Sequence, residues 1–286
     1  MRTVKIITDS ASDLPPRFYK DYDISMLPMG VTFDDKTYLD VVELDKKTFF
    51  SMMKENTDSM PKTSMPPVAI MDAEFRKNLD AYEHQIFVSI SSKGSGTYNF
   101  ANIVKNQIEE SIGKKSNITV IDSLSYSIGY GIAVVDMARA AYGGAGFDEV
   151  MRVYNETRGK IHVSLIVDDL MHLQRGGRIN PAVAVVGGML GIKPLLTIAD
   201  GIIDSCGKER GKSRAMDKII DEMIGRIGNS DEKRIWLIHA DAAEDVLLLK
   251  DAICERITPT ELIICDMGAC VGVHTGRGLL GLVYTA

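Results

Sequence analysis

Short apolar runs alternate with helical stretches along the first half of this 286-residue chain. Residues 4–7, 86–90 and 118–121 are rich in β-branched side chains, which is typical of strands covered on both faces. Apolar residues recur at helical spacing over 101–112 and again over 128–142. This alternation predicts an α/β fold in which helices flank a mostly parallel sheet.

The second half of the chain has a different pattern. Residues 192–206 contain two extended runs joined by Asp200 and Gly201, a pair that predicts an antiparallel hairpin. Further helices are expected over 213–227 and 242–256, and further strands over 234–239, 261–265 and 280–284. A hairpin combined with strand–helix units indicates a mixed sheet. We therefore expect an N-terminal α/β domain over residues 1–157 and a C-terminal mixed α/β domain over 158–286.

Charge and composition exclude several classes of protein. A net charge of −6 without a basic stripe argues against binding of nucleic acid. The longest apolar region, 182–199, is broken by glycines, Lys193 and Pro194, so no stable membrane insertion is expected. The N-terminus enters a strand pattern without the apolar segment of a signal peptide. The four cysteines lack zinc-site spacing, and we interpret them as reduced core thiols. These features predict a cytoplasmic protein with no metal.

The segment SSKGSGT, residues 91–97, joins a predicted strand to a predicted helix. A dinucleotide-binding loop would need a third glycine where this chain has Asn99. A nucleophile elbow centred on Ser95 would need glycines where Lys93 and Thr97 stand. Another hydrolase geometry stays open, because catalytic triads are recognised by geometry rather than by spacing. The other interpretations are that the hydroxyls cap the helix, or that they bind a carboxylate together with the free N–H groups of its first turn.

A second glycine-containing segment, CGKERGKS at 206–213, is one residue short of a P-loop. The spacing matters because consecutive backbone N–H groups must converge on one phosphate. A solvated basic loop is the better interpretation of this segment.

Two further clusters have the same chemistry as the segment 91–97. In PKTSMPP, residues 61–67, Thr63 and Ser64 lie between prolines that favour an extended backbone. In HTGRGLLG, residues 274–281, His274 and Thr275 precede a glycine turn and an apolar run. Each cluster also has an ordinary explanation. The first is also explained by a surface loop, and the second by the polar start of a strand.

Taken together, these stretches resemble the DegV family, also known as the fatty-acid-binding subunits of bacterial fatty acid kinase. The similar segments follow one another in the family's order and span nearly the whole chain: ITDSASDLP (7–15), PKTS (61–64), SISSKGSGTY (89–98), LMHLQRGGRI (170–179), GIKPLLTIADG (191–201), GKERGKSRA (207–215) and HTGRGLLGL (274–282). The chain departs from the family at 65–67, at Gly94 and at Arg277. These departures leave the hydroxyls and His274 in place. We therefore expect them to affect the preferred length or saturation of the acyl chain.

The resemblance implies a two-domain α/β protein that buries one long-chain fatty acid, such as palmitate, between its domains. Thr63 and Ser95 would bind the carboxylate, and His274 would lie close by. The tail would occupy an apolar tunnel, with residues 183–196 as one expected wall; an ordinary packed helix and strand is the other interpretation of that stretch.

The resemblance also implies a partner and no independent catalysis. A separate kinase subunit would phosphorylate the bound fatty acid, so no cofactor is expected beyond that ligand. Arg175, Arg178, Lys208 and Arg210 would then form a surface that faces the partner or a phosphate, or else a solvated basic surface. The alternative function is a hydrolase or acyltransferase that uses Ser95 and His274.

Overall fold

The computed structural model describes residues 2–55, 60–168, 170–179, 191–228 and 233–286. Its first sheet contains four parallel strands in the order β2-β1-β6-β7. The strands are β1 (Arg2–Asp9), β2 (Ser25–Leu27), β6 (Tyr82–Ser89) and β7 (Ile118–Asp122). The strands predicted around residues 4–7, 86–90 and 118–121 are therefore confirmed, and so is their parallel arrangement.

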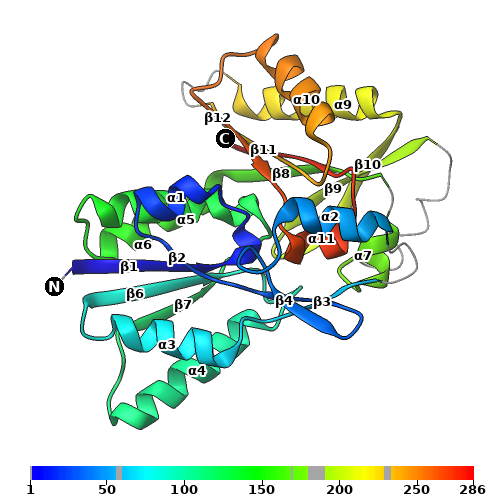
Figure 1. Cartoon of the computed structure of the whole chain (residues 1–286). Coiled ribbons are helices and arrows are strands. Elements are labelled where there is room, and N and C mark those ends of the chain that lie inside the picture. The colour runs from blue at the N-terminus through cyan, green and yellow to red at the C-terminus, as the bar shows by residue number, and fades with distance from the viewer. Residues whose placement is uncertain (1, 56–59, 169, 180–190, 229–232) are drawn as a thin grey trace.

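Helices cover both faces of this sheet (Figure 1). One face carries α3 (Val68–Asn78) and α4 (Thr97–Ile112), whose apolar side chains pack with Ile7 and Phe87. The other face carries α1 (Pro16–Asp21), α5 (Ile128–Tyr142) and α6 (Phe147–Lys160). Coverage on both faces explains why the strands are continuously apolar rather than alternating.

The second sheet contains six strands in the order β10-β9-β8-β13-β11-β12. Its strands are β8 (Ile161–Ile166), β9 (Ile192–Ala199), β10 (Ile202–Arg210), β11 (Arg234–His239), β12 (Glu261–Asp266) and β13 (Leu280–Thr285). Only the β11–β12 pair among them is parallel, so this described sheet is mixed, as predicted. The β9–β10 hairpin turns at Asp200 and Gly201, both with positive φ, which is the backbone of a type I′ turn.

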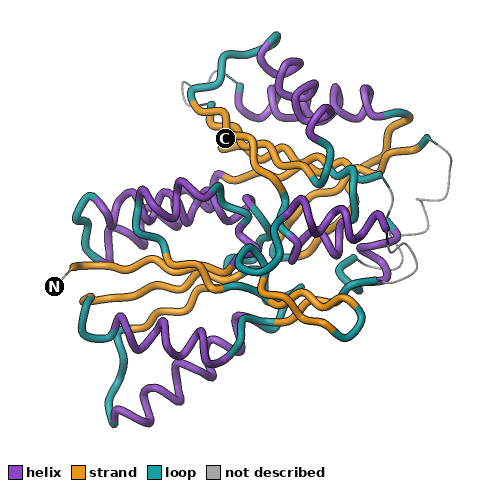
Figure 2. The backbone as a smooth tube through the Cα atoms, viewed as in Figure 1, coloured by secondary structure: helices purple, strands orange, loops and turns teal. Residues whose placement is uncertain are grey.

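The two sheets pack through the layer that contains α5. Figure 2 shows this helical layer between the sheets, with α9 (Lys212–Ile227) and α10 (Ala243–Cys254) on the far side of the second sheet. Because α5 lies against both sheets, apolar side chains are buried around most of its circumference. Phe18 of α1 stacks on Trp236 of β11 with ring centroids 5.2 Å apart, which joins the same layer to the second sheet.

A small antiparallel sheet and several short helices complete the fold. The small sheet has the order β4-β3-β5, with β3 (Gly30–Phe33), β4 (Lys36–Leu39) and β5 (Lys62–Ser64). The neighbouring short elements are the 3₁₀ turn η1 (Ser10–Ser12) and the helices α2 (Lys46–Glu55), α7 (Met171–Arg175) and α11 (Ala269–Thr275). These elements position most of the polar side chains discussed below.

The sequence pattern did not predict every element. It missed α3, α6, β8 and the small sheet, and it placed the HTG segment at a strand entry, whereas His274 lies in the last turn of α11. The expected tunnel wall at 183–196 lies largely outside the described residues, although Leu195 and Leu196 are buried in β9. The division into domains at residue 157 stays a prediction. Among the residues described, no helix has the length and apolar character to cross a membrane.

Candidate functional site

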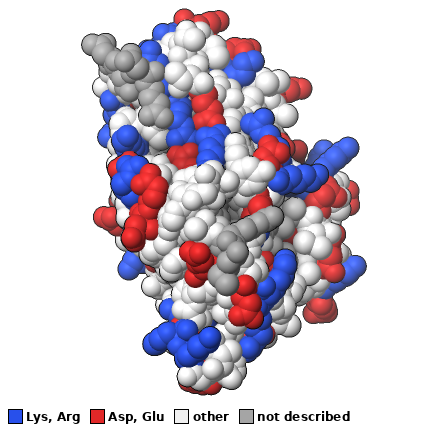
Figure 3. All heavy atoms as spheres, turned by 90° about the vertical axis from the view of Figure 1, so that its left-hand side faces the viewer, with Lys and Arg blue, Asp and Glu red and all other residues white. Residues whose placement is uncertain are grey.

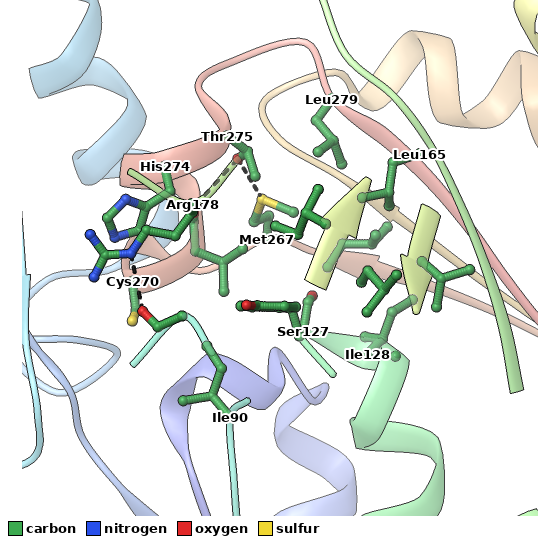
Figure 4. A pocket seen from close by; sticks show the side chains of 18 of the residues that line it. Ile90, Ser127, Ile128, Leu165, Arg178, Met267, Cys270, His274, Thr275 and Leu279 are labelled. Carbon is green, nitrogen blue, oxygen red and sulfur yellow. Dashed lines mark hydrogen bonds between the residues drawn. The ribbon is translucent and has the colours of Figure 1, made fainter. Parts of the chain in front are cut away.

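The candidate site is a pocket with about 730 Å³ of empty space, a figure that includes space open to solvent. Residues of all three sheets or their flanking loops line it (Figure 4). Its wall is mainly apolar and includes Ile90, Ile128, Val163, Leu165, Leu173, Ile198, Ile203, Ile238, Val271, Leu279 and Val283. Arg178 and His274 lie together at one end of it, so the pocket suits a ligand with a long apolar body and one polar group.

Three segments that are distant in sequence meet at the polar end. Thr63 comes from β5, Ser95 from the loop before α4, and His274 from α11, and all three line the pocket. The Thr63 Oγ1 and His274 Nε2 atoms lie 2.9 Å apart in a hydrogen bond that spans 211 positions. The structure thus brings together the three residues predicted to surround a carboxylate.

Ser95 hydrogen-bonds to the first residue of α4 and also lines the pocket. Its Oγ accepts a hydrogen bond from the backbone N–H of Thr97 at 3.3 Å and shares another with the Thr97 hydroxyl at 2.9 Å. It therefore supports the first turn of α4 while it also lines the pocket. The Thr97 side chain is fully buried, so Ser95 is the hydroxyl of this pair that a ligand can reach.

His274 is electrically neutral at neutral pH. Burial lowers the pKa of this imidazole to about 4, with help from the positive charge of Arg178 and from His172. Its Nδ1 atom is buried and has no hydrogen-bond partner among the described residues. A buried N–H without an acceptor is costly, so the tautomer with the proton on Nε2 is favoured. In that tautomer His274 donates to the Thr63 oxygen and leaves the Thr63 proton free for the pocket.

Arg178 supplies a positive charge at the same end of the pocket. Its Nε donates to the backbone oxygen of Gly94 at 3.0 Å, and its guanidinium also donates to the backbone oxygen of Gly176. Figure 4 shows the guanidinium beside His274. The sequence predicts Arg178 only as part of a surface that faces a partner or a phosphate. In the structure it lines the pocket, directly after a turn in which Gly177 has φ +70°.

The other three basic residues of that predicted surface are not in the pocket lining. Arg175 is exposed at the end of α7, and Lys208 and Arg210 are exposed on β10. Their predicted role toward a partner or a phosphate stays a prediction.

The geometry does not support a serine-dependent hydrolase. The side chains of His274 and Ser95 hydrogen-bond to Thr63 and Thr97, respectively, rather than to each other. The second nitrogen of His274 has no partner in the described part of the chain, whereas a catalytic triad needs a group there to orient the ring.

The described residues contain neither a metal site nor a disulfide. No group of three or more His, Cys, Asp or Glu side chains in this part of the chain could hold a metal ion. All four cysteines are free, but only Cys265 and Cys270 are buried. The prediction of four core thiols is therefore wrong for Cys206 and Cys254, which are exposed on β10 and at the end of α10.

A family model described as an uncharacterised protein of the DegV family matches residues 3–286. The chain belongs to the DegV family. A DegV domain-containing protein of Caldanaerobacter subterraneus is 33% identical over 99% of both chains, and protein DegV of Bacillus subtilis is 28% identical over 98% of both.

Solved structures of DegV proteins share the whole fold. A DegV family protein of Thermus thermophilus, described by its fatty acid binding, has a TM-score of 0.89 at 26% identity and 99% coverage of both chains. DegV of Bacillus subtilis, described as a fatty acid binding protein, has a TM-score of 0.86 at 27% identity, covering 100% of this chain and 99% of that one. A DegV family protein of Ruminococcus gnavus, described with vaccenic acid, has a TM-score of 0.86 at 25% identity, covering 99% of this chain and 100% of that one.

Proposed function

We propose that this protein binds one long-chain fatty acid, with the carboxylate at the polar end of the pocket and the acyl chain along its apolar wall. The observation that carries the proposal is the distribution of the lining. Arg178 and His274 lie together at one end (Figure 4), with Thr63 hydrogen-bonded to His274 and Ser95 next to Gly94, whose oxygen accepts from Arg178, and apolar side chains form most of the remainder. The fatty-acid ligands described for related DegV structures support it.

The polar end fits an anion rather than a neutral head group. Thr63 and Ser95 can each donate an O–H, and Arg178 adds the charge that neutral His274 lacks. A hydrogen bond to a charged group contributes about 1.5–3 kcal/mol. Each buried CH₂ contributes about 0.8 kcal/mol, so the tail supplies most of the affinity and the head fixes its direction.

The role in the cell follows from the family resemblance. We infer a cytoplasmic bacterial carrier without catalysis of its own, which presents its fatty acid to the kinase subunit of fatty acid kinase. The exposed cations Arg175, Lys208 and Arg210 are the proposed contacts with that partner or with phosphate. Figure 3 shows acidic and basic side chains interspersed over one face of the molecule, which on that face does not resemble the continuous basic surface of a nucleic-acid-binding protein.

The decisive experiment is extraction of the purified protein into organic solvent, followed by mass spectrometry. We expect a long-chain fatty acid in a one-to-one ratio to protein. After removal of the lipid, calorimetry should show binding of palmitate or oleate, and weaker binding of the matched methyl esters, which lack the negative charge. A protein that yields no lipid and binds neither acid would overturn the proposal.

A further inference from the structure

At its apolar end, the pocket is separated from a second pocket by a few shared residues. Figure 4 places Ile128 and Leu165 on the side opposite to His274 and Arg178, which makes that side the tail end. Three lining residues near this end, Gly129 of α5, Val163 of β8 and Ile198 of β9, also line a second pocket. The two pockets therefore face each other across one layer of residues.

The second pocket has a different character. Besides the three shared residues, its wall includes the polar side chains of Ser123, Ser125, Tyr154, Asn155, Arg158 and Asp200. The hydroxyl of Tyr154 is buried and has no hydrogen-bond partner in the described part of the chain. Methylene groups gain little from entering such a space. The apolar path thus ends where the shared residues stand.

We propose that Gly129, Val163 and Ile198 form a wall one side chain thick that sets the longest acyl chain this protein accepts. The proposal rests on the proposed function, because it assumes that a fatty acid lies with its head at Thr63 and its tail toward this wall. It assigns these three positions as determinants of chain length.

The wall is tightly packed around Gly129. A Cβ atom added at this glycine would lie 2.6 Å from Ser125 Oγ and 3.2 Å from Val163 Cγ2, so the Val163 side chain packs directly against the helix backbone. Val163 is held in place by its neighbouring strand, since the Thr197 hydroxyl donates to the Val163 oxygen at 2.8 Å. A tail that reaches this contact meets packed atoms that separate it from the second pocket.

Truncation of Val163 gives a quantitative test. Val163→Ala removes two methyl groups and leaves room for up to two more carbons of the tail. Each methylene that becomes buried strengthens binding about fourfold, which is the conversion of about 0.8 kcal/mol. The reference is the longest saturated acid that the unaltered protein binds well. In Val163→Ala, acids that are one or two carbons longer should bind about four- to sixteen-fold more tightly than this reference acid.

Val283→Ala is the matched control. Val283 is the cross-strand partner of Val163 on β13, is buried, and lines the first pocket, but it is absent from the described lining of the second. The same two methyl groups are removed next to Val163, at a position that lines only the first pocket and so does not separate the two pockets. Ile198→Ala provides a second opening of the wall at a half-buried side chain, where truncation costs less stability.

The measurement is a competition series on delipidated protein with saturated fatty acids of increasing chain length, one or two carbons apart. A shift of the preferred length in Val163→Ala and Ile198→Ala, with none in Val283→Ala, supports the proposal. Unchanged ratios in both wall variants, or an equal shift in Val283→Ala, would overturn it while fatty-acid binding itself stands. Absence of binding by the unaltered protein would instead overturn the proposed function together with this inference.

Discussion

Replacement of Thr63 by valine tests the carboxylate anchor most directly. Valine has nearly the shape of threonine and suits a strand position, and Thr63 lies in β5 opposite Val31, so the fold should survive. The change removes the hydroxyl that we propose donates to the carboxylate, and a hydrogen bond of that kind is worth about 1.5–3 kcal/mol. We expect the dissociation constant for oleate to rise about ten- to 150-fold, measured by displacement of a fluorescent fatty acid.

Controls separate this effect from a general disturbance of the pocket. Thr63→Ser keeps the hydroxyl and should bind oleate within a few-fold of the unaltered protein. The affinity for methyl oleate should fall much less than that for oleate in Thr63→Val, because a neutral ester accepts a weaker hydrogen bond. A folded Thr63→Val protein with unaltered oleate affinity would refute the assignment of Thr63 as an anchor.

The role of His274 can be separated by a double-mutant cycle. If this imidazole acts by donating to Thr63 Oγ1, at 2.9 Å, its substitution should weaken binding in the unaltered protein but add little in the Thr63→Val background. Additive losses would show instead that His274 contacts the carboxylate on its own.

Further predictions concern charge, packing and pH. Arg178→Gln should weaken oleate binding more than methyl oleate binding, and should raise the pKa of His274 above about 4, as NMR titration would show. Gly176→Ala would place a methyl group against His274 Nδ1, so calorimetry should find weaker acyl binding, and retained affinity would contradict the described packing. Burial raises the pKa of Asp9 to about 6 and of Asp13 to about 7, from 3.8. The folded state then holds more protons than the unfolded chain between about pH 4 and 7, so urea denaturation should show the free energy of unfolding falling as pH rises through that window. His274 acts in the opposite direction between about pH 4 and 6.5, because its pKa is lowered, so His274→Gln should steepen that fall.

The architecture was readable from the sequence where elements are long and strongly patterned. Helix α5 and the strands β6 and β7 are continuous apolar runs, and the Asp200–Gly201 turn has its own signal. The small sheet was not readable, because strands of three or four residues are too short to show a period. Helix α6 was missed because its sequence is mostly polar and it buries only Val150, Tyr154 and Thr157.

The candidate site was only partly predictable. Thr63, Ser95 and His274 could be recognised as polar groups at the ends of apolar runs, but nothing in their spacing shows that they converge across more than 200 positions. The family resemblance supplied that step. The position of Arg178 in the pocket depends on the backbone of the Gly176–Gly177 turn, which sequence periodicity does not describe.

Buried carboxylates explain how such distant segments keep one geometry. Asp9 accepts the backbone N–H of Ile90 at 2.9 Å, just before the loop that carries Ser95. Asp13 accepts the N–H of Gly268 at 2.7 Å, and Asp40 accepts that of the next residue at 3.2 Å, which together fix the start of α11. Burial raises the pKa of all three acids, so each costs stability in its charged form. The fold tolerates that cost where the loop that carries Ser95 and the helix that carries His274 must be held in position. This arrangement is expected if the polar end of the pocket, rather than the core alone, constrains these positions.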